Sequence, residues 1–229
     1  MTDTPIASTR RNFLKLSISA EPAMVVGTHQ AAAADAAAAY VPVYFTALEW
    51  AFLRAAAAQL IPADDLGPGA VEAGVPEFID KQMATPWAEG RLWYMQGPFA
   101  PDAPATMGWQ SKLVLREVYR LGIQDANGWT QQTYGALFAD LSPDQQIEAL
   151  QKIESGEASF AQVPAKTFIS ILLANVSEGF FSDPRHVRSR TLVCWTLNGF
   201  PGARPEFMDW VDRDVAYPLP PVSIDGKRG

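Results

Sequence analysis

The stretch that decides the fold is PAKTFISILLANVSEGFF, residues 164–181. Pro164 is expected at its start, because a proline at the first helical position loses no hydrogen bond and already has a helical φ. From Phe168 to Phe181 the sequence is strongly apolar, and a helix that is apolar on most of its surface must be covered by other elements. We therefore predict a helix at the centre of the core.

Two further helices carry clear start and stop signals. Thr46-Ala47-Leu48-Glu49 is a capping box, in which the hydroxyl and the carboxylate satisfy amides of a first helical turn, and Pro62 ends the helix that follows. Ser142-Pro143-Asp144-Gln145 combines a cap, a proline at the first helical position and a glutamine three positions after the cap. Gly156 is expected to end that second helix.

Weaker signals predict the remaining elements. Short helices are expected at residues 76–83, 130–138 and 191–197, and a long one from about Trp109 to Gln124, closed by Asn127-Gly128. Few segments alternate apolar and polar residues with a period of two, so little β-structure is expected. The predicted fold is mainly α: a single irregular helical domain at residues 35–213, with long Pro/Gly-rich loops, and a Pro-rich C-terminal tail at residues 214–229.

The overall composition excludes several classes of protein. Of the 229 residues 48% are hydrophobic and 19% are charged, with 18 basic against 25 acidic side chains. This apolar fraction excludes a long disordered chain, and the scattered basic residues exclude nucleic-acid binding, which needs a clustered cationic surface. No stretch of about 18 apolar residues is present. We therefore expect the chain to reach a membrane only through partners.

Motifs for cofactors are also missing from the sequence. The single cysteine, Cys194, cannot form an internal disulfide, a Cys-rich zinc site or a Cys-x-x-Cys-His haem attachment, and we expect it to be a small buried hydrophobic residue. No Gly-x-Gly-x-x-Gly and no phosphate-binding loop occurs. We predict that the chain holds no cofactor or metal of its own, and that Asp64-Asp65 is a solvated turn rather than a cation site.

The first informative segment is Thr9-Arg10-Arg11-Asn12-Phe13-Leu14-Lys15. It resembles a twin-arginine export signal in every position of that pattern, namely the pair Arg10 and Arg11 followed by Phe13, Leu14 and Lys15. A run of small residues at 31–39 follows and suits signal peptidase, so residues 1–34 are predicted to be a signal peptide read by the Tat translocase. The alternative is a chance pair of arginines on an ordinary amphipathic helix.

The second informative segment begins at Glu178. It contains Glu178-Gly179-Phe180-Phe181, then Asp183-Pro184, then Trp195, and finally Gly199-Phe200-Pro201-Gly202. Two glycines around a rigid proline fix an unusual backbone path, which displays or tucks Phe200. These residues are predicted to be structural or to face a partner, and none is assigned a catalytic role.

Two other functions use residues of the same region. Glu178 and Asp183 are a possible pair of carboxylates for a stand-alone periplasmic glycosidase, which needs two such groups about 5–9 Å apart across a cleft. The seven tryptophans and six tyrosines could instead line the groove of a sugar-binding module. The sequence leaves both alternatives open.

The order of the motifs from Glu178 to Gly202 resembles the small subunit of gluconate 2-dehydrogenase, called subunit 3 or gamma. The resemblance covers about Tyr44 to Trp210, and the twin-arginine segment fits the same family. One segment departs from the family, which usually has a Tyr-Gly-Gly-Asn-like turn after Asp-Pro, whereas residues 185–190 here read RHVRSR. Either this turn is locally different or the coding sequence contains a short frame slip.

The resemblance implies a membrane-associated complex of three subunits on the periplasmic side of the bacterial inner membrane. A large subunit with FAD oxidises D-gluconate to 2-dehydro-D-gluconate, and a cytochrome c subunit with haem c carries the electrons to ubiquinone. The small subunit has no cofactor, so the family provides no catalytic residues for this chain. Its implied role is to support assembly and Tat export of the flavoprotein. The identity of the sugar acid depends on another chain.

Overall fold

The computed structural model describes residues 40–101, 103–186 and 192–228. Residues Pro42–Gly229 form one compact unit. The predicted signal peptide, with Arg10, Arg11, Phe13, Leu14 and Lys15, lies outside the described residues, and so does most of the departure at residues 185–190. Within the described ranges, no helix is long and apolar enough to cross a membrane.

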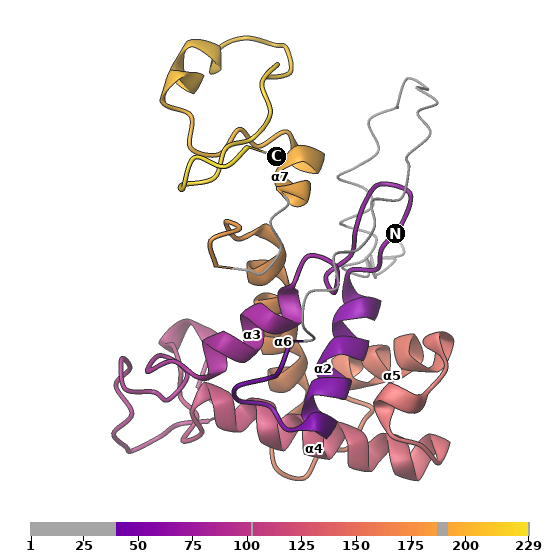
Figure 1. Cartoon of the computed structure of the whole chain (residues 1–229). Coiled ribbons are helices and arrows are strands. Elements are labelled where there is room, and N and C mark those ends of the chain that lie inside the picture. The colour runs from indigo at the N-terminus through magenta and orange to yellow at the C-terminus, as the bar shows by residue number, and fades with distance from the viewer. Residues whose placement is uncertain (1–39, 102, 187–191, 229) are drawn as a thin grey trace, which may run out of the picture. The chain divides into compact units, whose positions relative to one another are not determined.

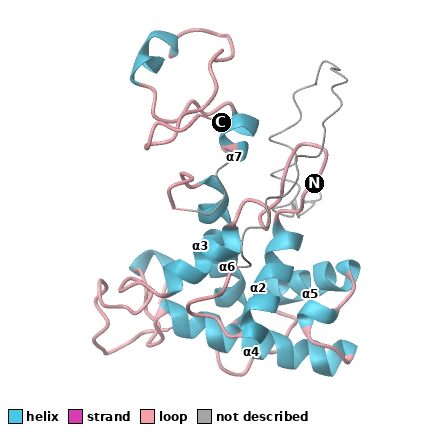
Figure 2. Ribbon diagram, viewed as in Figure 1, coloured by secondary structure: helices cyan, strands magenta, loops and turns pink. Residues whose placement is uncertain are grey.

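Helices and loops make up the described chain (Figure 2), and no strand occurs in it beyond isolated bridges. The predicted mainly α, single-domain fold is therefore confirmed. The α-helices are α2 (Ala47–Leu60), α3 (Val75–Met83), α4 (Leu115–Tyr134), α5 (Pro143–Ser155), α6 (Ala165–Phe181) and α7 (Val193–Asn198). Short 3₁₀ helices lie at η1 (Ala105–Met107), η2 (Phe138–Asp140) and η3 (Pro205–Trp210).

Helix α6 contacts α2, α3, α4, α5 and α7, as its apolar sequence predicted (Figure 1). Its residue Phe168 is fully buried, and the Phe168 ring contacts the rings of Phe52, Tyr119 and Phe160. Helix α4 comes close to the same ring at Gly122, where the absence of a side chain leaves room for Phe168. The neighbouring helices therefore pack closely around α6, and the glycine of α4 leaves room for one of its large side chains.

The predicted helix starts are found at two of the outer helices. Thr46 and Glu49 form a reciprocal capping box at α2, and Ser142 and Gln145 form one at α5. Gly156 ends α5 in the left-handed conformation, with a φ of 84°. These predictions hold because capping depends on residues close in sequence, whatever packs against the helix.

The prediction for α4 was wrong at both ends. Residues 109–114 are not helical, and the helix runs from Leu115 through Asn127-Gly128 to Tyr134 without a break. Gly128 faces solvent, so it costs the helix only about 1 kcal/mol, while the buried side chains of Ile123, Ala126 and Thr130 hold both halves against the core. The actual C-cap is Gly135, with a φ of 78°.

The segment after α6 has more structure than its sequence predicted. Helix α7 lies close to the expected residues 191–197, and the 3₁₀ helix η3 was not expected. Residues near the C-terminus fold back: the backbone of Val222 pairs with Gly202, and the Tyr217 ring contacts Phe207 and Trp210. The Pro-rich stretch is therefore tied to the loop after α7.

Candidate functional site

Glu178 lies in a chain of hydrogen bonds that leads into the core. The Tyr119 hydroxyl donates to Asn175 Oδ1 (2.9 Å), and Asn175 Nδ2 donates to Glu178 Oε2 (2.9 Å). Gln82 Nε2 on α3 donates to the same carboxylate oxygen at 3.3 Å. Burial, with a smaller effect from the Glu178 charge, raises the pKa of Tyr119 well above its ordinary value. The Glu178 carboxylate therefore orients an amide that satisfies a buried hydroxyl.

Gly179, the next residue, allows α6 to approach α3. A Cβ built on Gly179 would lie 2.9 Å from Cδ1 of Phe78 and 3.1 Å from Cγ1 of Val75. Both distances are closer than ordinary van der Waals contact, so a side chain here would push the two helices apart. The glycine is explained by packing.

Asp183 joins the end of α6 to the C-terminal segment. Its side chain is almost fully buried, and its two carboxylate oxygens accept the backbone amides of Arg185 (2.9 Å) and Ile224 (2.8 Å). The His186 amide donates to the Asp183 carbonyl at 2.9 Å, which closes the turn at Pro184. Residues 187–190 of the departing segment lie outside the described residues.

Trp195 connects α7 to the end of α6 and to the glycine loop. Its indole Nε1 donates to the carbonyl of Phe181 (2.9 Å), and its ring meets the Phe200 ring edge to face, with centroids 5.0 Å apart. Trp195 is 8% exposed, whereas Phe200 is 51% exposed. The loop therefore leaves Phe200 half exposed to solvent, with its ring packed against the buried ring of Trp195.

The two glycines of the loop serve different purposes. Gly199 ends α7 in the left-handed conformation with a φ of 66°, and nothing lies within 4 Å of the position of a Cβ. Gly202 has a φ of 70°, and a Cβ there would collide with the Val222 carbonyl oxygen and with the Trp195 ring. Gly199 is needed for its backbone conformation, and Gly202 for both conformation and space.

These residues surround an open hollow of about 650 Å³. Nine residues line it, four of them aromatic, and they come from the end of α6, from α7, from the loop that follows and from η3. The side chain of Arg204 is 10% exposed and lies in the wall, where its guanidinium donates to Glu206 Oε1 (3.1 Å) and to the Pro220 carbonyl (2.6 Å). The aromatic members are Phe181, Trp195, Phe200 and Phe207.

The residues considered for other functions have structural partners in the fold. Glu178 and Asp183 bind different groups, as described above. Trp87, Trp93 and Trp109 contact one another edge to face and pack against the core, with ring centroids 5.4 and 5.5 Å apart. No cluster of three or more metal-ligating side chains is present in the described part of the chain.

Two smaller predictions concern Cys194 and the pair Asp64-Asp65. Cys194 is 7% exposed, as expected of a small buried residue, and burial raises the pKa of its thiol to about 11. Asp64 and Asp65 lie in an exposed turn, where the Asp64 carboxylate accepts the Leu66 amide (2.9 Å). The buried cysteine and the exposed turn both agree with the structure.

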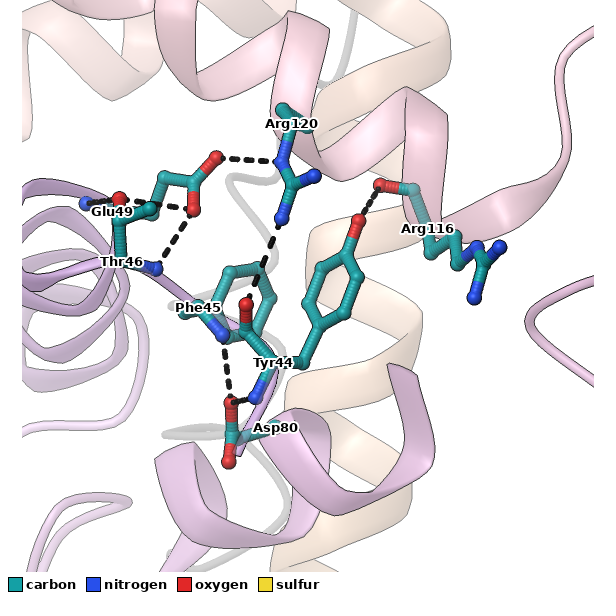
Figure 3. A network of polar contacts seen from close by, with 7 residues as sticks. All are labelled: Tyr44, Phe45, Thr46, Glu49, Asp80, Arg116 and Arg120. Atoms are coloured by element: carbon teal, nitrogen blue, oxygen red, sulfur yellow. Dashed lines mark hydrogen bonds and ion pairs between the residues drawn. The ribbon is translucent and has the colours of Figure 1, made fainter. Parts of the chain in front are cut away.

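A polar network that joins α2, α3 and α4 was missed by the sequence analysis (Figure 3). The fully buried carboxylate of Asp80 on α3 accepts the backbone amides of Val43 (2.7 Å), Tyr44 (3.0 Å) and Phe45 (3.0 Å). Beside it, Arg120 Nε donates to Glu49 Oε1 at 3.0 Å. The available signal was an aspartate on the apolar face of α3, between positions that must be buried.

The same network fixes the chain just before α2. The Tyr44 hydroxyl donates to the Arg116 carbonyl on α4 (2.8 Å), and the Arg120 guanidinium lies 4.7 Å from the centroid of the Tyr44 ring. Residues 43–45 are thus held by α3 and α4 at once (Figure 3). This network anchors the start of the domain.

Fold and site together define a small helical domain with a rigid aromatic loop after its central helix. The model of one family, gluconate 2-dehydrogenase subunit 3, matches residues 47–202, which include every motif residue from Glu178 to Gly202. The chain belongs to this family, as the sequence motifs indicated. No curated protein and no solved structure matches the chain significantly.

Proposed function

We propose that the chain is the small, non-catalytic subunit of an FAD-dependent gluconate 2-dehydrogenase complex. Membership of the subunit 3 family supports a role within that dehydrogenase. One observation favours a non-catalytic role: Glu178, Asp183 and Trp195 all use their polar atoms to hold this chain together, while Phe200 is left exposed. The polar groups of these three motif residues support the segment that exposes Phe200.

In this proposal the partner subunits perform the chemistry. The flavoprotein, with FAD, oxidises D-gluconate at C2 to 2-dehydro-D-gluconate, and a cytochrome c subunit with haem c passes the electrons on. The small subunit stabilises the flavoprotein and escorts it through the Tat translocase to the periplasmic side of the inner membrane. The twin-arginine segment from Thr9 to Lys15 supports the escort role.

Co-purification from the native host tests the proposal. The chain carries an affinity tag at its C-terminus, and the eluate is assayed for FAD and for gluconate-dependent reduction of an artificial electron acceptor. We expect near-stoichiometric FAD and gluconate oxidation in the complex, and neither in the chain expressed alone. Hydrolysis of glycosides by the isolated chain, or tight binding of sugars to it, would support one of the alternative functions instead.

A further inference from the structure

The C-terminal part of the chain has a small core for its length. Among residues 192–228, the buried apolar cluster consists of Leu192, Cys194 and Trp195, with Phe180 of α6 packed against it. The helices from α2 to α6 share a much larger cluster. Ordering a segment of this length costs conformational entropy that so little buried apolar surface offsets only in part.

Large apolar side chains of this part of the chain lie in solvent instead. From Phe181 onward, eight such side chains among the described residues are at least 37% exposed, including Phe200 (51%), Met208 (78%) and Ile224 (62%). Phe181 and Phe200 line the hollow, and the other six are distributed along residues 197–224. Aromatic side chains are enriched at protein–protein interfaces, and here two exposed ones line the same hollow.

The loop that carries Phe200 is held by backbone hydrogen bonds. The Phe200 amide donates to the Trp195 carbonyl at 2.8 Å, and the Ala203 amide donates to the Val222 carbonyl at 2.8 Å. The close approach at Gly202 fixes the Trp195 ring against the same backbone. A rigid, half-exposed aromatic side chain loses little entropy on binding, which is the property of residues that dominate interface energies.

The chemistry of the hollow selects an apolar occupant. Four of its nine lining residues are aromatic. The one cation among the nine, Arg204, donates to Glu206 and to the Pro220 carbonyl, while its buried Nε has no hydrogen-bond partner among the described residues. The Arg204 side chain is 10% exposed and offers little surface to an anionic ligand, whereas an apolar side chain in the hollow would cover Phe181, Phe200 and Phe207.

We propose that the hollow around Phe200 is the docking surface for the flavin-containing subunit, which inserts an apolar side chain between Phe181, Phe200 and Phe207. This inference rests on the proposed function, because it takes the flavoprotein as the partner. The family match supports this choice, since it extends into the loop that forms the hollow and the family is named as a subunit.

The test compares variants of the tagged full-length chain purified from the native host, with FAD per chain as the measurement. Phe200→Asp places a charge in the hollow and should reduce bound FAD at least ten-fold, while Phe200→Leu should retain most of it. Leu92→Asp is the matched control, because Leu92 is 72% exposed and lies outside the hollow. Thermal unfolding of each isolated chain checks that the variants fold.

The outcomes separate this inference from the proposed function. If the unchanged chain carries no FAD, the proposed function fails. If the unchanged chain and Phe200→Asp carry equal FAD, or if folded Leu92→Asp loses as much as Phe200→Asp, the docking surface is wrong while the function stands. If the isolated chain is a dimer that Phe200→Asp dissociates, a second copy occupies the hollow and the inference is overturned.

Discussion

The ring of Trp195 fills the space beside Gly202. A Cβ built on Gly202 would lie 2.7 Å from Cζ3 of this ring and would also collide with the Val222 carbonyl oxygen. Trp195 also donates a hydrogen bond from its indole nitrogen to the end of α6. Gly202 therefore affects the packing of three segments, namely the end of α6, α7 and the C-terminal segment. The Gly199-Phe200-Pro201-Gly202 motif therefore includes a close approach of the backbone at Gly202 to the Trp195 ring.

Substitution at the two loop glycines should separate strain from collision. Gly199→Ala meets nothing within 4 Å, so it should cost only the strain of a positive φ, about 1 kcal/mol. Gly202→Ala has similar strain and the collisions as well, and should cost about 2–4 kcal/mol. Urea unfolding of the isolated chain measures both. Equal losses would mean that the Trp195 contact does not constrain the loop.

The same comparison within α4 should give effects of opposite sign. Gly122→Ala improves helix propensity but drives a Cβ into the Phe168 ring, so it should destabilise the chain by about 1–3 kcal/mol. Gly128→Ala meets nothing within 4 Å and should stabilise it by about 0.5–1 kcal/mol. Thermal unfolding of the two variants provides the measurement. Stabilisation by Gly122→Ala would show that the core relaxes easily around Phe168.

Removal of the Asp80 charge should be costly. Asp80→Asn keeps one acceptor oxygen but weakens three hydrogen bonds from the backbone of residues 43–45, and it buries an amide group among those donors. We expect a loss of about 3–5 kcal/mol in the free energy of unfolding. Asp64→Asn in the exposed turn is the control and should change stability by less than about 0.5 kcal/mol. Similar values for the two variants would contradict an anchoring role.

The Cys194 thiol should be unreactive in the folded chain. Burial raises its pKa to about 11, so little thiolate exists at pH 8, and reaction with a thiol reagent should be slow until urea unfolds the protein. Because the folded pKa lies above the unfolded value, this group favours the folded state below about pH 9, and its contribution is lost as the pH rises toward 11. Rapid labelling of the folded chain at pH 8 would contradict this prediction.

Export should depend on the arginine pair. Replacing Arg10 and Arg11 by lysines removes the two guanidinium groups of the proposed Tat signal, and should strand this chain and its proposed flavoprotein partner together in the cytoplasm. In the proposed complex the cytochrome subunit is exported by another route, so it should still reach the membrane and serves as the control. Cell fractionation with a dehydrogenase assay on each fraction gives the answer. A flavoprotein that still appears outside the inner membrane would leave this chain only an assembly role.

The local signals in the sequence were enough for most helices. Caps at Thr46 and Ser142 and the apolar run from Phe168 to Phe181 predict α2, α5 and α6, because each signal acts within one or two helical turns. The same local reasoning failed at Asn127-Gly128, where packing outweighs a weak helix former. Of the candidate site, the sequence predicted the motif residues and left open whether they act chemically or hold the fold.

The sequence by itself determined the helical class, the positions of the strongest caps and the family. Tertiary structure alone decided that Asp80 binds amides 35 to 37 positions earlier, that Gly202 lies against Trp195, and that Asp183 holds residue 224. The physical reason is distance along the chain. Propensity and capping are properties of neighbouring residues, whereas a buried carboxylate or a missing side chain acquires its role only when folding brings remote segments within contact.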